Sequence, residues 1–429
     1  MKRNIAILFI ILVALLNIGC PLQKYEITVF SPVYMGIDKI RESVVPNSTD
    51  IPDFNSLGKF ILYNNYIFIN KMNKGIFVID NTNKTSPQII KFISIPGNID
   101  LAIKDDILYA DSYVDLIAFY ISDINNISIA KRLENVFPRE DMQPFLGKDI
   151  DFSNPDFKYE IKQVDKTKGI VVDWEETKEI RAIDPLKYFS SLSPYTSNPV
   201  YYESTETEGG GTSIGGSMAR FTLYDNYLYA VYNSDLYVFD ISTTSNPSLS
   251  GKFGVAWNIE TIFCYNKNIF IGGQDGVYIY DVSNDPVKPE YLSRLVHVRT
   301  YDPVVVANGY AYSTLRGNLN QLDIIDIRDI KQPQLVTTYP MTEPYGLGIT
   351  SLSDKNYLFI CDGKEGVKIY DAPNPFYLIL KKVILKGEKS YDVILYNNTA
   401  YIVTSTSFYQ YDYSNIDNIT QLSKITIKK

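Results

Sequence analysis

The chain has 429 residues, 45% of them hydrophobic, which is enough apolar surface to bury a large core. Its 41 Lys and Arg residues stand against 49 Asp and Glu residues, a net charge of −8 without any basic stretch. This balance argues against nucleic-acid binding and against electrostatic docking on anionic lipid. Three cysteines in so long a chain exclude a disulfide scaffold, and we expect Cys264 and Cys361 to be buried free thiols.

The N-terminus reads MKRNIAILFIILVALLNIGC, a cationic start followed by an apolar run over 5–16 and a cysteine. Such a run is typical of a secretory signal and is too short to span a bilayer comfortably. It resembles the bacterial lipoprotein signal, in which the cysteine is lipidated, although Asn17 stands where that signal usually has leucine. We therefore expect a lipoprotein signal peptide at 1–19, lipidation of Cys20 and a lead-in segment over 20–57. The other interpretation is an ordinary cleaved signal followed by a chance cysteine.

The lipoprotein resemblance also implies a cellular location. Lipidation would tether the protein to a membrane by acyl chains, as an extracytoplasmic domain of the bacterial cell envelope. No other stretch approaches the roughly 18 apolar residues that a membrane span requires. Pro21 replaces the Asp that often signals retention at the inner membrane, so we expect the outer membrane or the cell surface.

One short motif recurs along the rest of the chain, an apolar burst that ends in Asp. Examples are GIFVID, DLYVFD and GVYIYD. Apart from one long gap, the bursts recur about every 40 to 45 residues, a period that is typical of repeat architectures. Their terminal positions are Asp80, Tyr120, Asp240, Asp281, Asp326, Asp371 and Asp412.

Each period holds four short runs that are rich in Ile, Val, Tyr and Phe and separated by polar turns, as in GLGITSL, NYLFICDG, GVKIYDA and LILKKVIL. Four strands per period of this length are typical of a β-propeller, whose blades pack radially around a channel. We therefore predict an all-β fold, a β-propeller of seven four-stranded blades over 58–429. A linear β-solenoid is the competing fold, but its periods are usually about half as long.

The bursts GIFVID, LYVFDIS and GVYIYDVS resemble those of the LVIVD-repeat proteins, predicted bacterial β-propellers that are often lipoproteins. The resemblance covers roughly residue 58 to the C-terminus, and PVYMGIDKIRESV and GGSMARFTLYDNYLYAV are similar to the lipoprotein members. The resemblance implies the fold and the cellular location rather than an activity, because the biochemical role of the family is largely undefined. The second and seventh repeats depart from the motif, with Tyr120 in place of the Asp and with Ile127 and Ile419 in place of a proline.

We interpret the recurring Asp as a structural residue. Its short side chain can accept hydrogen bonds from the amides of the turn that follows. A proline often stands seven residues later, as at Pro87, Pro247 and Pro333. There it ends the turn and begins an outer strand, where a missing amide hydrogen is tolerated.

The long gap between the second and third repeats holds an insertion over 138–217. It occupies the link from one blade's outermost strand to the next blade's innermost strand, and such links lie on the face where propellers usually bind ligands. The insertion is therefore a candidate lid or specificity element. Within it, the sequence of residues 159–183 predicts a hairpin with KTKG as its turn. The stretch ESTETEGGGTSIGGS predicts a loop. The gap could also hold two degenerate blades, but it lacks the burst motif.

The other links reach the same face and carry polar or aromatic residues just before the innermost strand. These candidate ligand-binding residues are Asn98, Asp100, Trp257, Asn258, Glu260, Arg299, Tyr301, Asp302, Glu343, Tyr345, Tyr391 and Asp392. Because the links converge on the channel mouth, we expect a ring of Tyr, Trp and carboxylate side chains there. Such a ring suits a sugar or a peptide. The alternative is a solvated rim without a specific ligand.

The residues of catalytic and metal sites are scarce. His297 is the only histidine, which excludes a histidine-rich zinc site and makes any Ser-His-Asp triad depend on it. GGSMA places Ser217 in a faint likeness of a nucleophile elbow, but the strand, turn and helix of that motif are absent. GGGTSIGG lacks the Lys and the helix of a phosphate loop. We therefore name no catalytic residue, no metal and no cofactor.

The sequence favours a lipid-anchored binding module for a protein or a glycan, attached to the membrane through its N-terminal lipid. One competing hypothesis is an envelope hydrolase or lyase that uses carboxylates such as Asp302 and Glu343 as acid and base. The other is an assembly scaffold. Propellers host binding and catalysis alike, so the fold does not choose among these functions.

Overall fold

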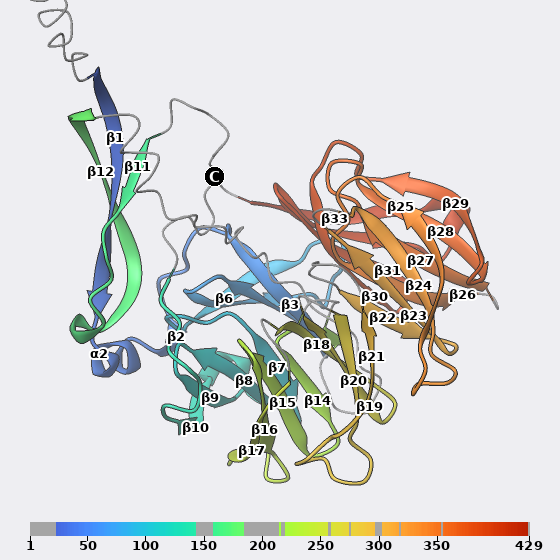
Figure 1. Ribbon diagram of the computed structural model, residues 1–429, viewed down its shortest axis with the longest axis horizontal. Coiled ribbons are helices and arrows are strands. Elements are labelled where there is room, and N and C mark those ends of the chain that lie inside the picture. Colours follow the sequence, from blue (N-terminus) through green and yellow to red (C-terminus); the bar gives the residue numbers. More distant parts are fainter. Residues whose placement is uncertain are drawn as a thin grey trace, which may run out of the picture. The chain divides into compact units, whose positions relative to one another are not determined.

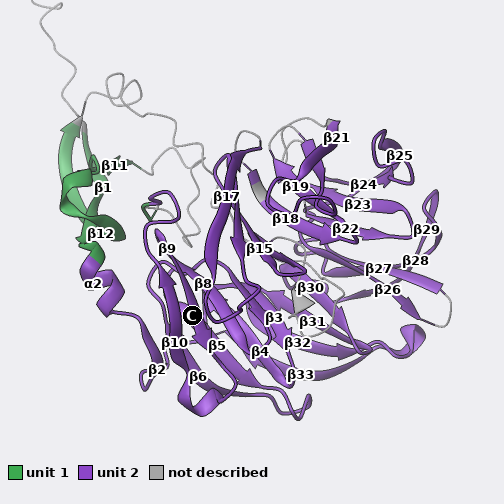
Figure 2. Cartoon of the chain, turned by 90° about the horizontal axis from the view of Figure 1, so that it is seen from below, with its two compact units in different colours: residues 1–37, 141–200 green, residues 38–140, 201–429 purple. Residues whose placement is uncertain are grey.

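The computed structural model describes residues 23–142, 158–183, 214–215, 219–255, 259–273, 276–296, 303–316, 319–352 and 355–427. The chain divides into two compact units, one formed by residues 1–37 and 141–200 and the other by 38–140 and 201–429 (Figure 2). The larger unit contains seven antiparallel sheets that each hold four strands consecutive in the chain (Figure 1). This confirms the prediction of seven four-stranded blades.

The first four blades run in chain order. Their strands are β3 (Leu57–Tyr63), β4 (Tyr66–Lys71), β5 (Gly75–Asp80) and β6 (Gln88–Ser94) in blade 1; β7 (Leu101–Lys104), β8 (Ile107–Ser112), β9 (Asp115–Tyr120) and β10 (Ser128–Leu133) in blade 2; β14 (Phe221–Tyr224), β15 (Tyr227–Tyr232), β16 (Asp235–Asp240) and β17 (Ser248–Gly254) in blade 3; and β18 (Ile259–Tyr265), β19 (Asn268–Gly273), β20 (Gly276–Asp281) and β21 (Glu290–Val296) in blade 4.

The last three blades follow the same order. Their strands are β22 (Val304–Ala307), β23 (Tyr310–Leu315), β24 (Gln321–Asp326) and β25 (Gln334–Pro340) in blade 5; β26 (Leu347–Leu352), β27 (Lys355–Cys361), β28 (Val367–Asn374) and β29 (Tyr377–Ile384) in blade 6; and β30 (Ser390–Tyr396), β31 (Thr399–Thr404), β32 (Ser407–Asp412) and β33 (Thr420–Thr426) in blade 7. Short 3-10 helices at Ile124–Asn126 and Ile416–Asn418 precede the outer strands of blades 2 and 7.

The core consists of buried apolar clusters between neighbouring blades, one at each of the seven joints. Because each sheet is covered on both faces, its central strands are mainly apolar. All of β5 is buried except for Asp80 at its end. At the joint that closes the ring, the rings of Phe60 and Phe408 meet edge to face with centroids 5.2 Å apart, and Gln410 donates to Asn81 Oδ1 at 2.7 Å.

Blade 1 carries two further strands. β2 (Val45–Ser48) pairs with the outermost strand β6, and β13 (Ile214–Gly215) pairs with the innermost strand β3. The lead-in segment thus contributes a strand to the propeller. From β2, Asn47 accepts the N–H of Ile127 at 3.0 Å and donates to its carbonyl at 2.6 Å. Ile127 is the residue of blade 2 that takes the place of the proline in other repeats.

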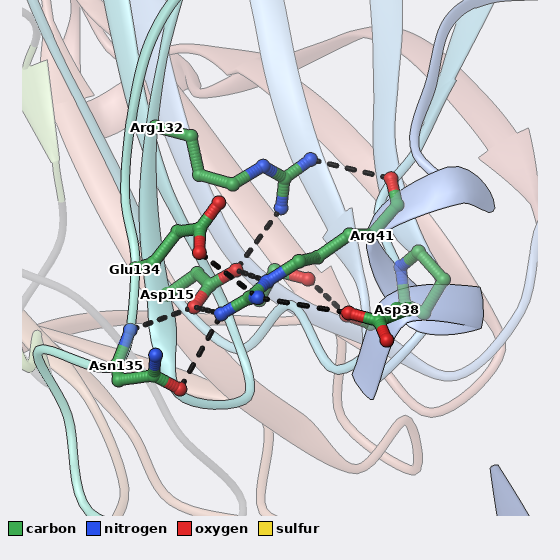
Figure 3. Close-up of polar contacts among 8 residues, drawn as sticks. Asp38, Arg41, Asp115, Arg132, Glu134 and Asn135 are labelled. Carbon is green, nitrogen blue, oxygen red and sulfur yellow. Dashed lines mark hydrogen bonds and ion pairs between the residues drawn. The ribbon is translucent and has the colours of Figure 1, made fainter. Parts of the chain in front are cut away.

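A charged cluster fixes the helix α2 (Ile37–Glu42) to blade 2 (Figure 3). Arg41 donates to both carboxylate oxygens of the buried Asp115, at 2.8 and 3.1 Å, and also pairs with Glu134 at 2.9 Å. Arg132 pairs with Asp115 at 3.3 Å, and the amide of Asn135 donates to it at 2.9 Å. This set of donors compensates for the burial of the Asp115 charge.

The loops lie on two faces that the contacts define. The link face holds the links between blades and the loops between second and third strands, as the hydrogen bond from the Asn73 amide to the Asn98 carbonyl shows. The hairpin face holds the turns between first and second and between third and fourth strands. There Tyr63 donates to Asp106 at 3.0 Å, and both residues, together with Ile121, Ser122, Asp123, Ile124 and Asn125, line a hollow of about 270 Å³.

The smaller unit is a three-stranded sheet with the order β11-β1-β12. β1 (Gln23–Met35) pairs antiparallel with β12 (Ile170–Ile183) from end to end, and β11 (Tyr159–Ile161) runs parallel to its other edge. The predicted hairpin over 159–183 is therefore wrong, because β1 lies between its two arms. KTKG falls in a 3-10 turn, η2 (Lys166–Lys168), in which the Asp165 side chain accepts the amide of Thr167. Phe30, Val171 and Trp174 form the core of this sheet.

The structural interpretation of the recurring Asp is confirmed in five repeats. Each of these side chains accepts the amide of the residue two positions later, at distances from 2.6 to 3.0 Å. They are Asp80, Asp240, Asp281, Asp326 and Asp412. The hydroxyl and amide of Thr82 hold the pKa of Asp80 below its ordinary value. Asp371 differs, because β28 continues past it for three residues and its Oδ1 accepts no hydrogen bond from any described residue.

Replacing Asp281 with Ala should lower the free energy of unfolding by about 1 kcal/mol, because Ser283 then loses the acceptor for its amide and hydroxyl. Asp371→Ala is the matched control, since it removes the same side chain from a repeat without this turn. Denaturant unfolding of both variants measures the difference. Equal losses of stability would contradict the turn-capping role.

Candidate functional site

The structure describes half of the predicted ring residues with their side chains, namely Asn98, Asp100, Glu343, Tyr345, Tyr391 and Asp392. Of Glu260, only the backbone in β18 is described. Cys20, Ser217, His297 and much of the insertion lie outside the described residues. So do the other five predicted ring residues, which are Trp257, Asn258, Arg299, Tyr301 and Asp302.

Glu343, Tyr345 and Tyr391 lie together at the links that enter blades 6 and 7. The Tyr345 hydroxyl donates to Glu343 Oε1 at 2.6 Å. The rings of Tyr345 and Tyr391 meet edge to face, with centroids 5.3 Å apart and an interplanar angle of 88°. Tyr345 is almost fully buried, whereas the Glu343 side chain is 37% exposed. The tyrosine therefore holds a carboxylate that solvent reaches.

Two cations complete this group, which we call the mouth cluster: Arg316, Glu343, Tyr345, Lys389 and Tyr391. The Arg316 guanidinium carbon lies 4.3 Å from the centroid of the Tyr345 ring. Lys389 pairs with Glu343 at 2.7 Å and lies 5.4 Å from the same ring. Sequence reasoning missed both cations. Arg316 directly follows the second strand of blade 5, and the rule that such loops share the link face could have found it.

Asp362 fixes the base of the mouth cluster. This carboxylate is fully buried, pairs with Lys368, and accepts the amides of Thr342 and Glu343 at 2.9 and 2.7 Å. Gly363 has a positive φ of 53°, and a Cβ atom there would lie 2.5 Å from Glu343 Oε2. The glycine therefore leaves the room that the Glu343 side chain occupies.

The electrostatics of the mouth cluster keep Glu343 ionised. Burial by itself would raise its pKa, but hydrogen bonds from Lys389 and Tyr345 and the charges of Lys389 and Arg316 hold the pKa of Glu343 below its ordinary value. A carboxylate in this state accepts hydrogen bonds and attracts cations, and it is a poor general acid at neutral pH. The arrangement suits polar recognition.

Asn98 and Asp100 belong to a separate network that is buried among blades 1, 2 and 3. Asn98 donates to Asp111 Oδ1 at 2.8 Å, and Asp100 pairs with Lys59 at 2.7 Å. Asp100 Oδ2 also accepts the amides of Arg220 and Phe221, at 2.5 and 2.9 Å. Both predicted residues are at most 2% exposed. Their observed contacts hold neighbouring blades together.

Asp111 is the innermost carboxylate of this network. Its Oδ1 accepts the amides of Ile99 and Asp100 at 2.8 and 3.0 Å, and its Oδ2 accepts the Tyr232 hydroxyl at 2.6 Å. Desolvation raises the pKa of Asp111 to about 6 despite these hydrogen bonds. Desolvation, with the Asp111 charge, also raises the pKa of Tyr232 well above its ordinary value.

The two ends of the insertion meet beside the same network. Glu140 lies near the start of the insertion and Arg220 lies just after its end, and their side chains pair at 2.9 Å. The Arg220 guanidinium carbon also lies 5.0 Å from the centroid of the Tyr232 ring. The ion pair therefore connects the points at which the chain leaves and re-enters the propeller.

The remaining predicted residues are structural where the structure describes them. Asp392 is buried and accepts the amide of Val393 at 2.9 Å. Cys264 and Cys361 are buried free thiols, as predicted, and desolvation raises the pKa of Cys264 to about 12.

The described residues hold no group of three or more His, Cys, Asp or Glu side chains that could bind a metal ion. They also contain no helix long and apolar enough to cross a membrane.

Asp111→Asn should change how stability depends on pH. A raised pKa means that protonated Asp111 stabilises the fold, so its contribution is complete below about pH 4 and is lost as the pH rises through about 6. Relative to the variant, the natural protein should therefore lose about 3 kcal/mol of unfolding free energy over this window. Asn can still accept the two amides and donate to Tyr232. Parallel pH profiles from denaturant unfolding would contradict the shift.

Comparison with known proteins bears on the repeats and on the fold. The LVIVD repeat model matches residues 60–93, 215–255 and 300–341, which correspond to blades 1, 3 and 5. No curated protein matches the chain.

Two solved structures resemble the chain along most of its length. One is a candidate 6-phosphogluconolactonase from Bacteroides uniformis, 11% identical, with a TM-score of 0.53 and 87% of this chain and 97% of that chain covered. The other is a candidate 6-phosphogluconolactonase from Bacteroides fragilis, 8% identical, with a TM-score of 0.50 and 88% and 100% covered. Identities this low show the fold alone. The chain therefore contains LVIVD repeats and has a β-propeller-like fold.

Proposed function

We propose that this protein is a binding module of the bacterial cell envelope, anchored by a lipid on Cys20, that recognises a protein or a glycan through its link face. The mouth cluster carries this proposal. It presents a fixed carboxylate and two cations on the link face, all partly exposed, with a buried tyrosine beneath them. Side chains that are held before the ligand arrives lose little entropy on binding.

The insertion supports the same face. It occupies the link that enters blade 3, and the pair of Glu140 and Arg220 joins its two ends. A long insertion in one link of a repeat protein gives that face a feature that the other links lack. We propose that the insertion contributes specificity and that the mouth cluster contributes polar contacts.

The mouth cluster favours binding over catalysis by an acid and base pair. A general acid at neutral pH needs a raised pKa, whereas the pKa of Glu343 is lowered. Lys389 and Tyr345 already occupy Oε1 of this carboxylate. An enzyme built on Glu343 would therefore have to use it as a base or as an electrostatic stabiliser.

The test is binding of the purified full-length protein to a panel of envelope glycans and solubilised envelope proteins. Arg316→Gln combined with Lys389→Gln should weaken binding by about tenfold or more, because each lost charge-assisted hydrogen bond costs roughly 1.5 to 3 kcal/mol. The matched control is Arg328→Gln with Lys331→Gln, which removes the same charge from the hairpin face of blade 5.

Equal losses in the two double variants would remove the link face from consideration. Binding that survives the loss of both Arg316 and Lys389 would show that the mouth cluster is not the site. Should no member of the panel bind the natural protein, the binding function itself would fail, and a catalytic or scaffold role would take its place. Thermal unfolding of each variant checks that the fold is intact.

A further inference from the structure

The repeats provide an internal standard for exposed apolar side chains. Among the side chains that the structure describes, the outermost strands of blades 1 to 5 each expose one large apolar residue, always near the start of the strand. These are Ile90, Ile129, Leu249, Tyr291 and Leu335. Blade 6 exposes five such residues at the turn and along β29, namely Phe376, Tyr377, Ile379, Leu380 and Val383. Phe376 and Tyr377 are 63% and 62% exposed.

Blade 6 also departs from the repeat in its backbone. β28 and β29 form a longer hairpin in place of the Asp-capped turn (Figure 1). Phe376 lies at the tip, between the end of β28 at Asn374 and the start of β29 at Tyr377. The tip is held in place. Its amide donates to Asn374 Oδ1 at 2.9 Å, and Tyr339 of blade 5 donates to the Phe376 carbonyl at 3.2 Å and accepts the Leu378 amide at 3.0 Å. The aromatic pair is therefore presented by a defined structure.

Lysines follow the aromatic pair along β29. Lys381 lies about 13 Å along the strand from Tyr377, at roughly 3.3 Å per residue. It is exposed and forms no ion pair with any described residue, and the neighbouring Lys382 reaches only the Asp417 carbonyl, at 3.3 Å. An aromatic tip followed by cations is the pattern of a membrane-interface anchor, in which rings enter the boundary between headgroups and acyl chains and lysines meet the lipid phosphates.

We propose that the β28–β29 hairpin docks in the interface of an anionic lipid bilayer, with Phe376 and Tyr377 inserted and with Lys381 and Lys382 at the phosphate level. The chain as a whole is acidic, so the attraction has to be local, and the apolar tip contributes the larger part of it. The tip of the β28–β29 hairpin connects the third and fourth strands of blade 6 and therefore lies on the hairpin face. A bilayer docked there leaves the link face open. Lysines in an edge strand also oppose pairing with a second copy of the same strand.

The test places a tryptophan at the tip of the full-length protein, as Phe376→Trp, on vesicles of phosphatidylcholine and phosphatidylglycerol. Brominated lipids should quench its emission, and the emission should shift to the blue, after subtraction of the signal from Trp174 and Trp257 in the natural protein. Tyr291→Trp is the matched control, because Tyr291 is a single exposed aromatic residue on the outer strand of blade 4. Any N-terminal anchor is the same in both variants.

Lys381→Gln with Lys382→Gln in the Phe376→Trp background should weaken docking on anionic vesicles by about fivefold for each lysine and leave it unchanged on phosphatidylcholine alone. The proposal fails if brominated lipid does not quench the tryptophan of Phe376→Trp while acrylamide still does. It also fails if brominated lipid quenches Phe376→Trp and Tyr291→Trp equally. Loss of acrylamide quenching with rising protein concentration in the absence of vesicles would replace the bilayer with a second copy of the chain. The link-face variants Arg316→Gln and Lys389→Gln should leave the quenching unchanged.

Discussion

The structure depends on the burial of each blade between its two neighbours. A single four-stranded sheet of this kind is apolar on both faces and cannot be stable in water by itself. Around the ring, seven apolar clusters cover these faces, and the last of them joins blade 7 to blade 1 through Phe60, Phe408 and their neighbours. The four main strands of every blade are consecutive in the chain, so blades 7 and 1 share no strand. Side-chain packing and the Asn81–Gln410 hydrogen bond close the ring between them.

Buried charges lie at the link face, in the links between blades and beside the loops between second and third strands. Asp115 binds two arginines, Asp100 binds Lys59, and Asp362 binds Lys368. A buried charge that loses its partner is costly, so these pairs specify the path of the loops around them. The mouth cluster is built on one of these supports, because Asp362 accepts the amides that position Glu343. The same physical device that shapes the links therefore also presents polar groups to solvent.

Local sequence patterns predicted the features that depend on near neighbours. The burst and its Asp imply a strand followed by a turn, and the amides that satisfy Asp80 or Asp281 lie two residues away. Asp371 shows the limit of this reasoning. The motif is present, but the residues after it continue the strand, and the turn is replaced by a hairpin with an aromatic tip. The candidate site shows the same limit, since Asn98, Asp100 and Asp392 stand in the links but make buried contacts.

By itself, the sequence determined the number of blades, the strand order within each blade and the face that each loop reaches, because a fixed period and short turns leave one way to pair consecutive strands. Tertiary structure alone decided which distant residues meet. It paired β1 with β12, set Arg316 over Tyr345, and left the tip of blade 6 exposed. Such contacts join residues that are far apart in the chain. Ring closure and competition among side chains for burial decide which of these residues meet, so a local sequence pattern cannot predict them.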